Sequence, residues 1–280
     1  MQETLQIERK HEVLSLVTNV AFSNVPSWYG STRRDLCMDL LVPKFRESHA
    51  PCPCIVWVCG GAYMVVDRSV WIPEMLYFAR AGYVVASIEY RTSNEARFPA
   101  PLIDAKAAVR YLKAHAGEYC IDPERVYIMG ESAGGTLASL VGTTAGRPEF
   151  EQGDWLDQDS SVRAVVDFYG PSLIEETSCN TNDDVPYWTM EAFLGPRFTP
   201  EQAKRASAAA YVTPASPPFM ILHGQADPLI PLAQSEHFYE ALKKNGVDVE
   251  FLILESAGHG DDRFYQDAIK DRILDFLKRH

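Results

Sequence analysis

The sequence predicts an α/β fold, with a mostly parallel eight-stranded sheet, helices on both faces and a small cap insertion. Eight short apolar runs occur along the 280 residues, and helix-length amphipathic segments separate them from the third run onward. These later runs are apolar throughout, as expected of parallel strands that are covered on both faces. The segment 172–212 is too long for an ordinary connection in an α/β unit, which favours an insertion that covers a site.

The strands follow from these runs in chain order. They are expected at 12–22, 33–43, 54–60, 83–90, 125–130, 163–170, 218–224 and 248–255. The first two alternate in polarity and have no helix between them, so they are expected to form an antiparallel ribbon at the sheet edge. Helices are expected at 71–82, 100–117, 132–144, 232–246 and 261–280. Because no internal repeat or linker interrupts this order, residues 1–280 are expected to form a single domain with the cap inside it.

Composition argues against several classes of partner. The chain has 38 acidic and 26 basic residues and a formal charge of −12, which disfavours nucleic acids and anionic membranes as partners. No apolar run approaches the roughly 20 residues that span a bilayer, and the first residues lack a secretory pattern, so a cytoplasmic protein is expected. The six cysteines are scattered, and the Cys52/Cys54 pair lacks the second pair that a zinc site needs. We therefore expect free thiols, no metal and no cofactor.

Ser132 stands in "GESAGG", between a predicted strand and a predicted helix. A serine at such a position can simply cap the helix. The surrounding G-x-S-x-G pattern, with Gly130 and Gly134 two positions to either side, is instead typical of a sharp turn that projects a nucleophile above the strand ends. The sequence motif alone does not decide between these two roles, because a serine hydroxyl also needs a base that takes its proton.

A base and an acid follow Ser132 in the chain, in the order that such a triad requires. Of seven histidines, His259 lies in a loop after the last predicted strand, and His223, at the end of a buried strand, is its main rival. Asp227 follows the penultimate strand, where its alternative role is to cap a helix. The loops after parallel strands meet at one sheet edge, so we predict a Ser132, His259 and Asp227 triad.

The loop after the third strand, "VCGGAYM", supplies candidate donors for an oxyanion. Small residues allow its backbone to turn amides inward, and we expect the donors to be the N–H groups of Gly61 and Ala62 together with that of Ala133. Cys59 precedes these residues, and a packing role is favoured over a reactive thiol because no nearby cation is apparent.

These motifs together resemble the α/β-hydrolases of the hormone-sensitive-lipase-like esterase group, close to the small bacterial carbohydrate esterases. The resemblance rests on "VCGGAYM", "IEYRTSNEARFPAPLIDAKAAVRYL", "GESAGGTLA", "DFYGPS", "HGQADPLIP" and "GHG", and covers about residues 34 to 280. It implies a serine esterase without a cofactor. In the resembling family, histidine usually occupies the position of Cys59 and supports the oxyanion loop. Glu131 aligns with a commonly acidic position, for which a structural hydrogen bond is expected.

The expected partner is a small-molecule ester. The polar and acidic stretch "EETSCNTNDD" in the insertion disfavours an interfacial lipase, and the resemblance suggests acetylated or feruloylated sugars. We expect four aromatic residues to contact the substrate, namely Tyr63, Tyr169, Tyr187 and Trp188. The alternative for the aromatic residues of the cap is that they form a small core of the cap itself. Two other functions stay open: an amide-cleaving relative of the aminopeptidase or arylformamidase type, and a ligand-binding protein on a hydrolase fold. The oligomeric state is also open, with a homodimer as one option.

Overall fold

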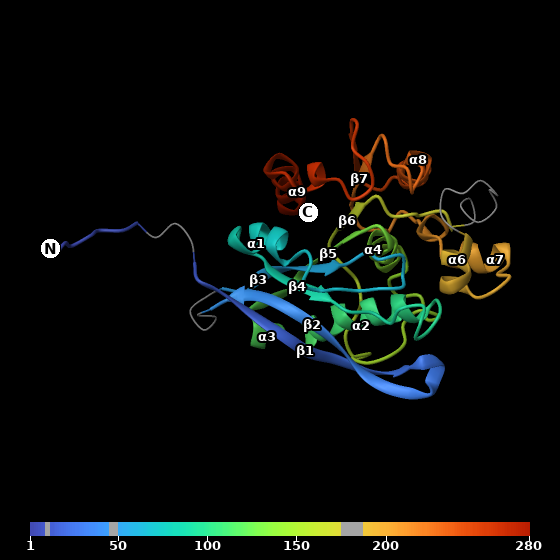
Figure 1. Cartoon of the computed structure of the whole chain (residues 1–280), viewed down its shortest axis with the longest axis horizontal. Helices are drawn as coiled ribbons and strands as arrows, with labels where there is room; N and C mark the ends of the chain where they lie inside the picture. Colours follow the sequence, from blue (N-terminus) through green and yellow to red (C-terminus); the bar gives the residue numbers. More distant parts are fainter. Residues whose placement is uncertain (9–11, 45–49, 175–186) are drawn as a thin grey trace.

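A computed structural model describes residues 1–8, 12–44, 50–174 and 187–280 of the chain (Figure 1). Its centre is one eight-stranded sheet in the order β1-β2-β4-β3-β5-β6-β7-β8. The strands are β1 (Leu14–Ser27), β2 (Thr32–Pro43), β3 (Cys52–Val58), β4 (Val84–Ile88), β5 (Ile121–Glu131), β6 (Val165–Phe168), β7 (Phe219–Gly224) and β8 (Val249–Leu254). All eight predicted strands are confirmed.

The sheet begins as an antiparallel ribbon and continues as a parallel sheet. Strands β1 and β2 pair antiparallel, β2 pairs antiparallel with β4, and every later pair in the order is parallel. In Figure 1 the long β1–β2 ribbon runs along one side of the molecule. The expected edge ribbon is therefore confirmed. Along the edge strand β1, more buried residues mostly alternate with exposed ones because one face packs on the core, whereas residues 38–43 of β2 are all buried.

Helices cover both faces of the sheet. They are α1 (Ile72–Arg80), α2 (Ala100–Ala114), α3 (Ala116–Tyr119), α4 (Ala133–Thr143), α6 (Tyr187–Leu194), α7 (Pro200–Arg205), α8 (Leu232–Lys244) and α9 (Asp267–Arg279). Side chains of β3 alternate between the two hydrophobic cores, as the period of a strand requires. Val56 packs in the core that contains α2, α4 and α8, whereas Trp57 packs in the core with α1 and α9.

The predicted helix over 261–280 is divided in the structure. A 3-10 turn spans Asp262–Tyr265 and α9 begins only at Asp267, because Gln266 between them has an extended backbone. The Asp261 carboxylate accepts the N–H of Arg263 and so caps the short turn. The 3-10 turn therefore lies between the loop that carries His259 and the last helix.

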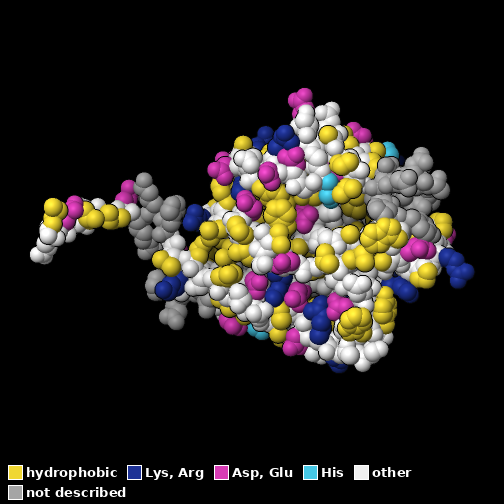
Figure 2. All heavy atoms as spheres, in the orientation of Figure 1, with side chains coloured by type: hydrophobic (Ala, Val, Ile, Leu, Met, Phe, Trp, Pro, Cys, Tyr) yellow, Lys and Arg dark blue, Asp and Glu magenta, His cyan; other side chains and the backbone are white. Residues whose placement is uncertain are grey.

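The carboxyl ends of the parallel strands form the edge at which the candidate site lies. The loops after β3, β5, β7 and β8 all open there, and α6 lies beyond α4 on the right of Figure 1. Among the described residues, no helix is both long and apolar enough to cross a bilayer. Figure 2 shows acidic side chains spread among hydrophobic ones on one face, with the basic side chains in scattered groups.

Candidate active site

Ser132 occupies a strained turn between β5 and α4. Its backbone has φ 53° and ψ −121°, and it is the residue at which α4 begins. Its N–H donates to the carbonyl of Phe168 on β6 at 2.9 Å, and its carbonyl accepts the N–H of Thr136 at 3.1 Å. A non-glycine residue with such a backbone persists only where its surroundings hold it. The neighbouring strand and the helix therefore fix Ser132 in this conformation.

The two flanking glycines are required by the same turn. A Cβ atom on Gly130 would lie 2.3 Å from the carbonyl oxygen of Gly134, and one on Gly134 would lie 2.0 Å from the carbonyl oxygen of Val58. Such distances are far below van der Waals contact. The expectation that small residues must flank Ser132 thus has a direct cause, which is the close approach of β5, α4 and the end of β3.

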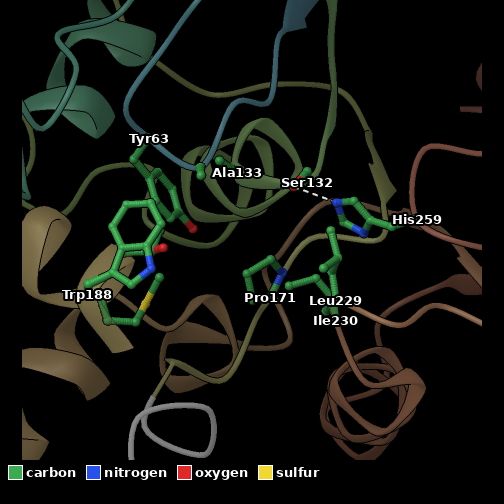
Figure 3. Close-up of a pocket in the computed structure, with 11 residues that line it drawn as sticks. Tyr63, Ser132, Ala133, Pro171, Trp188, Leu229, Ile230 and His259 are labelled. Carbon is green, nitrogen blue, oxygen red and sulfur yellow. Dashed lines mark hydrogen bonds between the residues drawn. The ribbon is translucent and has the colours of Figure 1, made fainter. Parts of the chain in front are cut away.

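Three predicted residues from three different loops form one chain of hydrogen bonds. His259 Nε2 lies 2.9 Å from Ser132 Oγ (Figure 3), and its Nδ1, on the other side of the ring, lies 2.8 Å from Asp227 Oδ2. Because a carboxylate only accepts, Nδ1 carries the proton and Nε2 is free to accept the Ser132 hydroxyl. The structure therefore places the three side chains as a nucleophile, a base and an orienting acid would be placed.

The side chain of Asp227, at the end of this series of hydrogen bonds, is fully buried. Burial raises the pKa of its carboxyl, but hydrogen bonds from His259 and from the N–H groups of Leu229 and Ile230 outweigh burial and leave the pKa lowered. Asp227 consequently stays ionised at neutral pH. An ionised carboxylate at 2.8 Å from His259 Nδ1 is suited to stabilising a protonated imidazole.

His223, the rival base, is used differently. Its Nε2 lies 2.9 Å from the carbonyl of Ile230 and its Nδ1 lies 2.7 Å from Ser235 Oγ, and the side chain is fully buried. Burial lowers the pKa of this histidine. Both ring nitrogens are thus engaged in holding the Asp227 loop, and neither faces Ser132.

The predicted oxyanion donors stand on either side of Ser132. Among the described residues, the N–H groups of Gly61, Ala62 and Ala133 donate to no protein acceptor. Gly61, Ala62 and Tyr63 are three consecutive residues with positive φ, at 122°, 53° and 61°. This backbone lies in the left-handed region and leaves the amides without internal partners, as an oxyanion site requires.

The Glu131 side chain supports the same loop, whereas the Cys59 side chain packs against residues outside it. Burial raises the pKa of the Cys59 thiol to about 12, so this group is neutral and unreactive. Its Sγ lies 3.3 Å from the carbonyl oxygen of Asp67, in agreement with a packing role. The Glu131 carboxylate accepts the N–H of Gly60 and also the indole N–H of Trp71. Burial raises the pKa of Glu131.

A cavity of about 210 Å³ opens in front of Ser132 and His259 (Figure 3). Side chains from the oxyanion loop, the segment after β6, helix α6 and the loop after Asp227 form its walls, which are almost wholly apolar. In addition to Ser132, His259, Ala62 and Ala133, the lining residues are Tyr63, Pro171, Trp188, Thr189, Met190, Leu229 and Ile230. Trp188 and Leu229 are 57% and 49% exposed, so they stand at the mouth.

The aromatic residues expected to contact substrate differ in their position relative to the cavity. Tyr63 and Trp188 line the cavity, and the ring of Tyr63 stacks on Phe193 at 3.8 Å. Tyr169 does not line it, because its fully buried ring packs edge-on against His259, with the ring centres 4.7 Å apart. Its hydroxyl pairs with that of Tyr265 at 3.1 Å. The side chain of Tyr187, at the start of α6, lies outside the described part of the chain.

Sequence reasoning missed four wall residues, namely Pro171, Thr189, Leu229 and Ile230. Leu229 and Ile230 follow Asp227 directly in "DPLIP", so their proximity to a predicted acid was the available signal. Thr189 and Pro171 carried no comparable signal. The described residues hold no group of three or more His, Cys, Asp or Glu side chains suited to a metal ion.

Comparison with known proteins gives relatives that are named esterases. The chain is 30% identical to Esterase LipQ of Mycobacterium tuberculosis over 263 residues, which cover 91% of this chain and 61% of that protein. It spans less than two thirds of the length of the curated relatives it first matches.

Solved structures match the whole chain. A truncated carbohydrate esterase from gut microbiota has a TM-score of 0.81 at 28% identity, with 98% of each chain covered. An acetyl ester-xyloside bifunctional hydrolase from Caldicellulosiruptor lactoaceticus has a TM-score of 0.72 at 27% identity, with 86% of each chain covered. The resemblance to α/β-hydrolase esterases is thus confirmed. Since the family model BD-FAE matches residues 38–242, the chain belongs to the BD-FAE family.

Proposed function

We propose that this chain is a serine carboxylic-ester hydrolase that acts on small soluble esters. The observation that carries this proposal is the unbroken hydrogen-bond chain from Ser132 through His259 to Asp227, which ends at a cavity. Its fold is shared with proteins that are themselves named esterases. A ligand-binding protein would not need a nucleophile, a base and an acid in hydrogen-bond contact.

The proposed reaction is acyl transfer in two steps. Ser132 Oγ bonds to the ester carbonyl carbon while His259 Nε2 takes its proton, and the N–H groups of Gly61, Ala62 and Ala133 stabilise the resulting oxyanion. His259 then returns the proton to the alcohol as the carbon–oxygen bond breaks. In the second step His259 takes a proton from water, and the water oxygen bonds to the acyl carbon. The bond between that carbon and Ser132 Oγ then breaks, His259 returns the proton to Oγ, and the carboxylic acid is released.

The cavity favours a short acyl group. Its volume of about 210 Å³ is below the roughly 300 to 1,000 Å³ of sites for drug-sized ligands. The described residues of its walls are almost wholly apolar and include no Lys or Arg, so a neutral and compact acyl group is the better fit. We propose that the alcohol lies at the mouth, across Trp188 and Leu229. A sugar ring is a suitable alcohol, because its apolar face stacks on an exposed aromatic side chain.

We also propose that residues 172–212 act as a cap within a single α/β-hydrolase domain. The described end of this segment supports the proposal, because Trp188, Thr189 and Met190 on α6 form one wall of the cavity. Phe193 on the same helix stacks on Tyr63, which joins this wall to the oxyanion loop.

The test is a panel of esters hydrolysed by the wild-type chain and by Ser132→Ala. The panel contains 4-nitrophenyl esters from acetyl to decanoyl, acetylated xylan oligomers and methyl ferulate. We expect the short acyl esters to be fastest and Ser132→Ala to lose at least about 10⁴-fold in kcat, with Ser161→Ala as an exposed control. Faster cleavage of aminoacyl anilides would favour the amide-cleaving alternative. Ester hydrolysis that persists in Ser132→Ala would contradict the mechanism.

A further inference from the structure

The oxyanion loop carries more backbone strain than its own sequence explains. Gly61, Ala62 and Tyr63 are consecutive residues in the left-handed region, and two of them have a Cβ atom. Each such non-glycine residue costs about 1 to 3 kcal/mol unless its surroundings hold it. In the resembling family a histidine side chain gives this support, and here the position holds Cys59. Some other part of this chain must therefore hold the loop.

The peptide group between Cys59 and Gly60 is held from both sides. Tyr90, which is fully buried, donates its hydroxyl to the carbonyl oxygen of Cys59 at 2.9 Å. The buried Glu131 carboxylate accepts the N–H of Gly60 from the same peptide group. A peptide group is planar, so fixing its oxygen and its nitrogen fixes the rotation of the whole plane. That plane is the one that leads into Gly61 and Ala62.

The Cys59 side chain takes no part in this arrangement. Its Sγ lies near the carbonyl of Asp67 at 3.3 Å and near Ser87 Oγ at 3.8 Å. Both partners lie outside the oxyanion loop. The contacts with Tyr90 and Glu131 instead use only the main chain of the loop, so they do not depend on which side chain stands at position 59.

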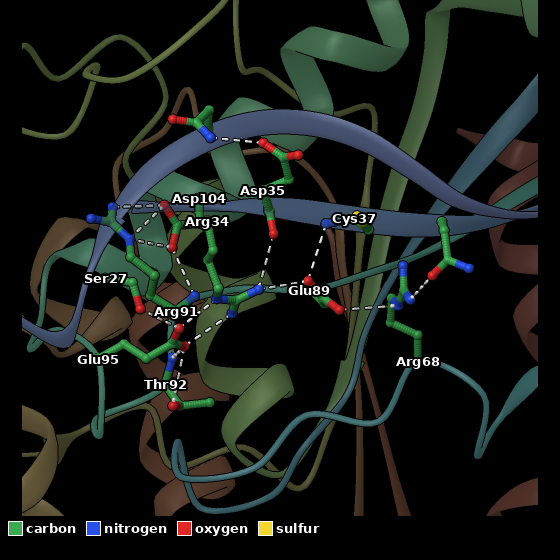
Figure 4. Close-up of polar contacts among 12 residues, drawn as sticks. Ser27, Arg34, Asp35, Cys37, Arg68, Glu89, Arg91, Thr92, Glu95 and Asp104 are labelled. Atoms are coloured by element: carbon green, nitrogen blue, oxygen red, sulfur yellow. Dashed lines mark hydrogen bonds and ion pairs between the residues drawn. The ribbon is translucent and has the colours of Figure 1, made fainter. Parts of the chain in front are cut away.

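Tyr90 is the first residue of the segment 90–95, which is held in place by ion pairs. Arg91 binds the buried Asp104 through two nitrogens, and Glu95 pairs with Arg34 on β2 (Figure 4). The N–H of Ser93 in this segment donates to the carbonyl of Tyr63 at 2.8 Å. The segment 90–95 is consequently a fixed support behind the oxyanion loop, and Tyr90 transmits that support to Cys59.

We propose that Tyr90 and Glu131 are positioning residues that hold the 59–60 peptide group and thereby orient the N–H groups of Gly61 and Ala62 toward the oxyanion. Together they would replace the support that the resemblance assigns to a histidine at position 59. This inference rests on the proposed esterase function. It adds that neither residue touches the substrate, and that both act through the backbone of the loop.

The test compares Tyr90→Phe with Tyr119→Phe. Tyr119 is also a buried tyrosine, and its hydroxyl pairs with that of Tyr111 on the far side of α2 from the site. For 4-nitrophenyl acetate we expect Tyr90→Phe to lower kcat about 10- to 100-fold with KM within about twofold, since a misdirected oxyanion donor affects only the transition state. Affinity for an aryl trifluoromethyl ketone, which forms an oxyanion on Ser132, should fall by the same factor. Tyr119→Phe should change neither quantity more than about twofold.

Substitutions at position 131 test whether a conservative change preserves activity, and a substitution at position 59 tests whether the Cys59 side chain matters. Glu131→Gln keeps an oxygen that accepts the Gly60 N–H and should retain kcat within about fivefold, whereas Glu131→Ala should lose about as much as Tyr90→Phe. Cys59→Ala should stay within about twofold of the wild type. Equal losses in Glu131→Gln and Glu131→Ala, or a larger loss in Cys59→Ala than in Tyr90→Phe, would overturn the proposal.

Hydrogen exchange distinguishes a failure of this positioning proposal from a failure of the proposed esterase function. Amides of residues 59–65 should exchange faster in Tyr90→Phe and Glu131→Ala than in the wild type, while those of the distant α9 keep their rates. Unchanged exchange in the loop would refute the positioning role, even for a chain that hydrolyses esters. Faster exchange in a chain that hydrolyses none of the panel would instead uphold the positioning role and contradict the esterase assignment.

Discussion

The catalytic edge and the α6 wall of the cavity are built in opposite ways. We use "catalytic edge" for the side chains of Ser132, Asp227 and His259 together with the main chain of the loop 59–65, and "α6 wall" for Trp188, Thr189 and Met190. At the catalytic edge, main-chain contacts with β6 and α4 hold the strained backbone of Ser132. At the α6 wall, the indole of Trp188 is 57% exposed at the mouth of the cavity.

This difference separates chemistry from specificity. Groups that must meet within hydrogen-bond distance lie on loops that the sheet core holds, so their geometry changes only with the fold. In the proposed function, the α6 wall contacts the substrate through side chains of an insertion. Thr189 and Met190 are buried, so it is substitution of the exposed Trp188 that changes the mouth of the cavity with least effect on the core. We therefore expect changes at the catalytic edge to alter kcat or stability, and changes at the α6 wall to alter KM and substrate choice.

The largest effect is expected for His259→Ala. Without this imidazole no group takes the Ser132 proton, so kcat should fall at least about 10⁴-fold, while the melting temperature stays within a few degrees. Steady-state kinetics with 4-nitrophenyl acetate measure the loss. The control is His237→Ala, on α8, which should keep full activity. A loss below about tenfold would show that another base serves Ser132.

Gly134→Ala tests whether the fold itself fixes the catalytic edge. The new Cβ would lie 2.0 Å from the carbonyl oxygen of Val58, so we expect a stability loss of at least about 3 kcal/mol and a melting temperature lower by about 6 to 12 °C. Gly117→Ala is the matched control, because a Cβ atom there meets nothing within 4 Å. Thermal unfolding measures both, and equal melting temperatures would contradict the close packing described for the turn.

Asp167→Asn tests the buried support below the catalytic edge. This carboxyl accepts Ser139 Oγ–H at 2.9 Å and the N–H of Gly170 at 2.9 Å, and burial raises its pKa from 3.8 to about 6. Because the folded chain then holds a proton that the unfolded chain has lost, this group's contribution to stability falls as the pH rises from about 4 through 6. Its size is about 3 kcal/mol.

The measurement is the melting temperature of the wild type and of Asp167→Asn at pH 4.5 and at pH 7.5. The stability of Asp167→Asn relative to the wild type should be greater at pH 7.5 than at pH 4.5. Asp157→Asn is the exposed control and should show no such difference. A relative stability of Asp167→Asn that is independent of pH would mean that Asp167 is not protonated in the folded chain.

The smallest effect is expected for Trp188→Ala. Loss of the exposed indole should raise KM about tenfold for an acetylated xylan oligomer and leave kcat and KM for 4-nitrophenyl acetate within about twofold. Trp28→Ala, at an equally exposed tryptophan on the β1–β2 turn, should change neither substrate. A fall in kcat for both esters would mean that the α6 wall affects the chemical step, as the catalytic edge does, and would contradict the distinction between the two regions.

The sequence carried the architecture and the triad because both leave local patterns. Apolar runs and amphipathic segments gave all eight strands, and Ser132, Asp227 and His259 each follow a predicted strand, so their loops had to meet at one edge. Tyr169 also follows a predicted strand and was expected in the cavity, yet its ring packs behind His259. The position of a loop residue is thus predictable from the strand order, whereas the direction of its side chain is not.

Tertiary structure alone decided the contacts between distant segments. Nothing in the pattern around His223 shows that both of its nitrogens are engaged, because its partners, Ser235 and the carbonyl of Ile230, become neighbours only when the loop after β7 folds back. The support of the Cys59 main chain by Tyr90, 31 residues away, is of the same kind. Strands and turns arise from interactions between near neighbours, which a sequence pattern records. Hydrogen bonds between separate loops depend on the packed positions of both, which only the folded chain determines.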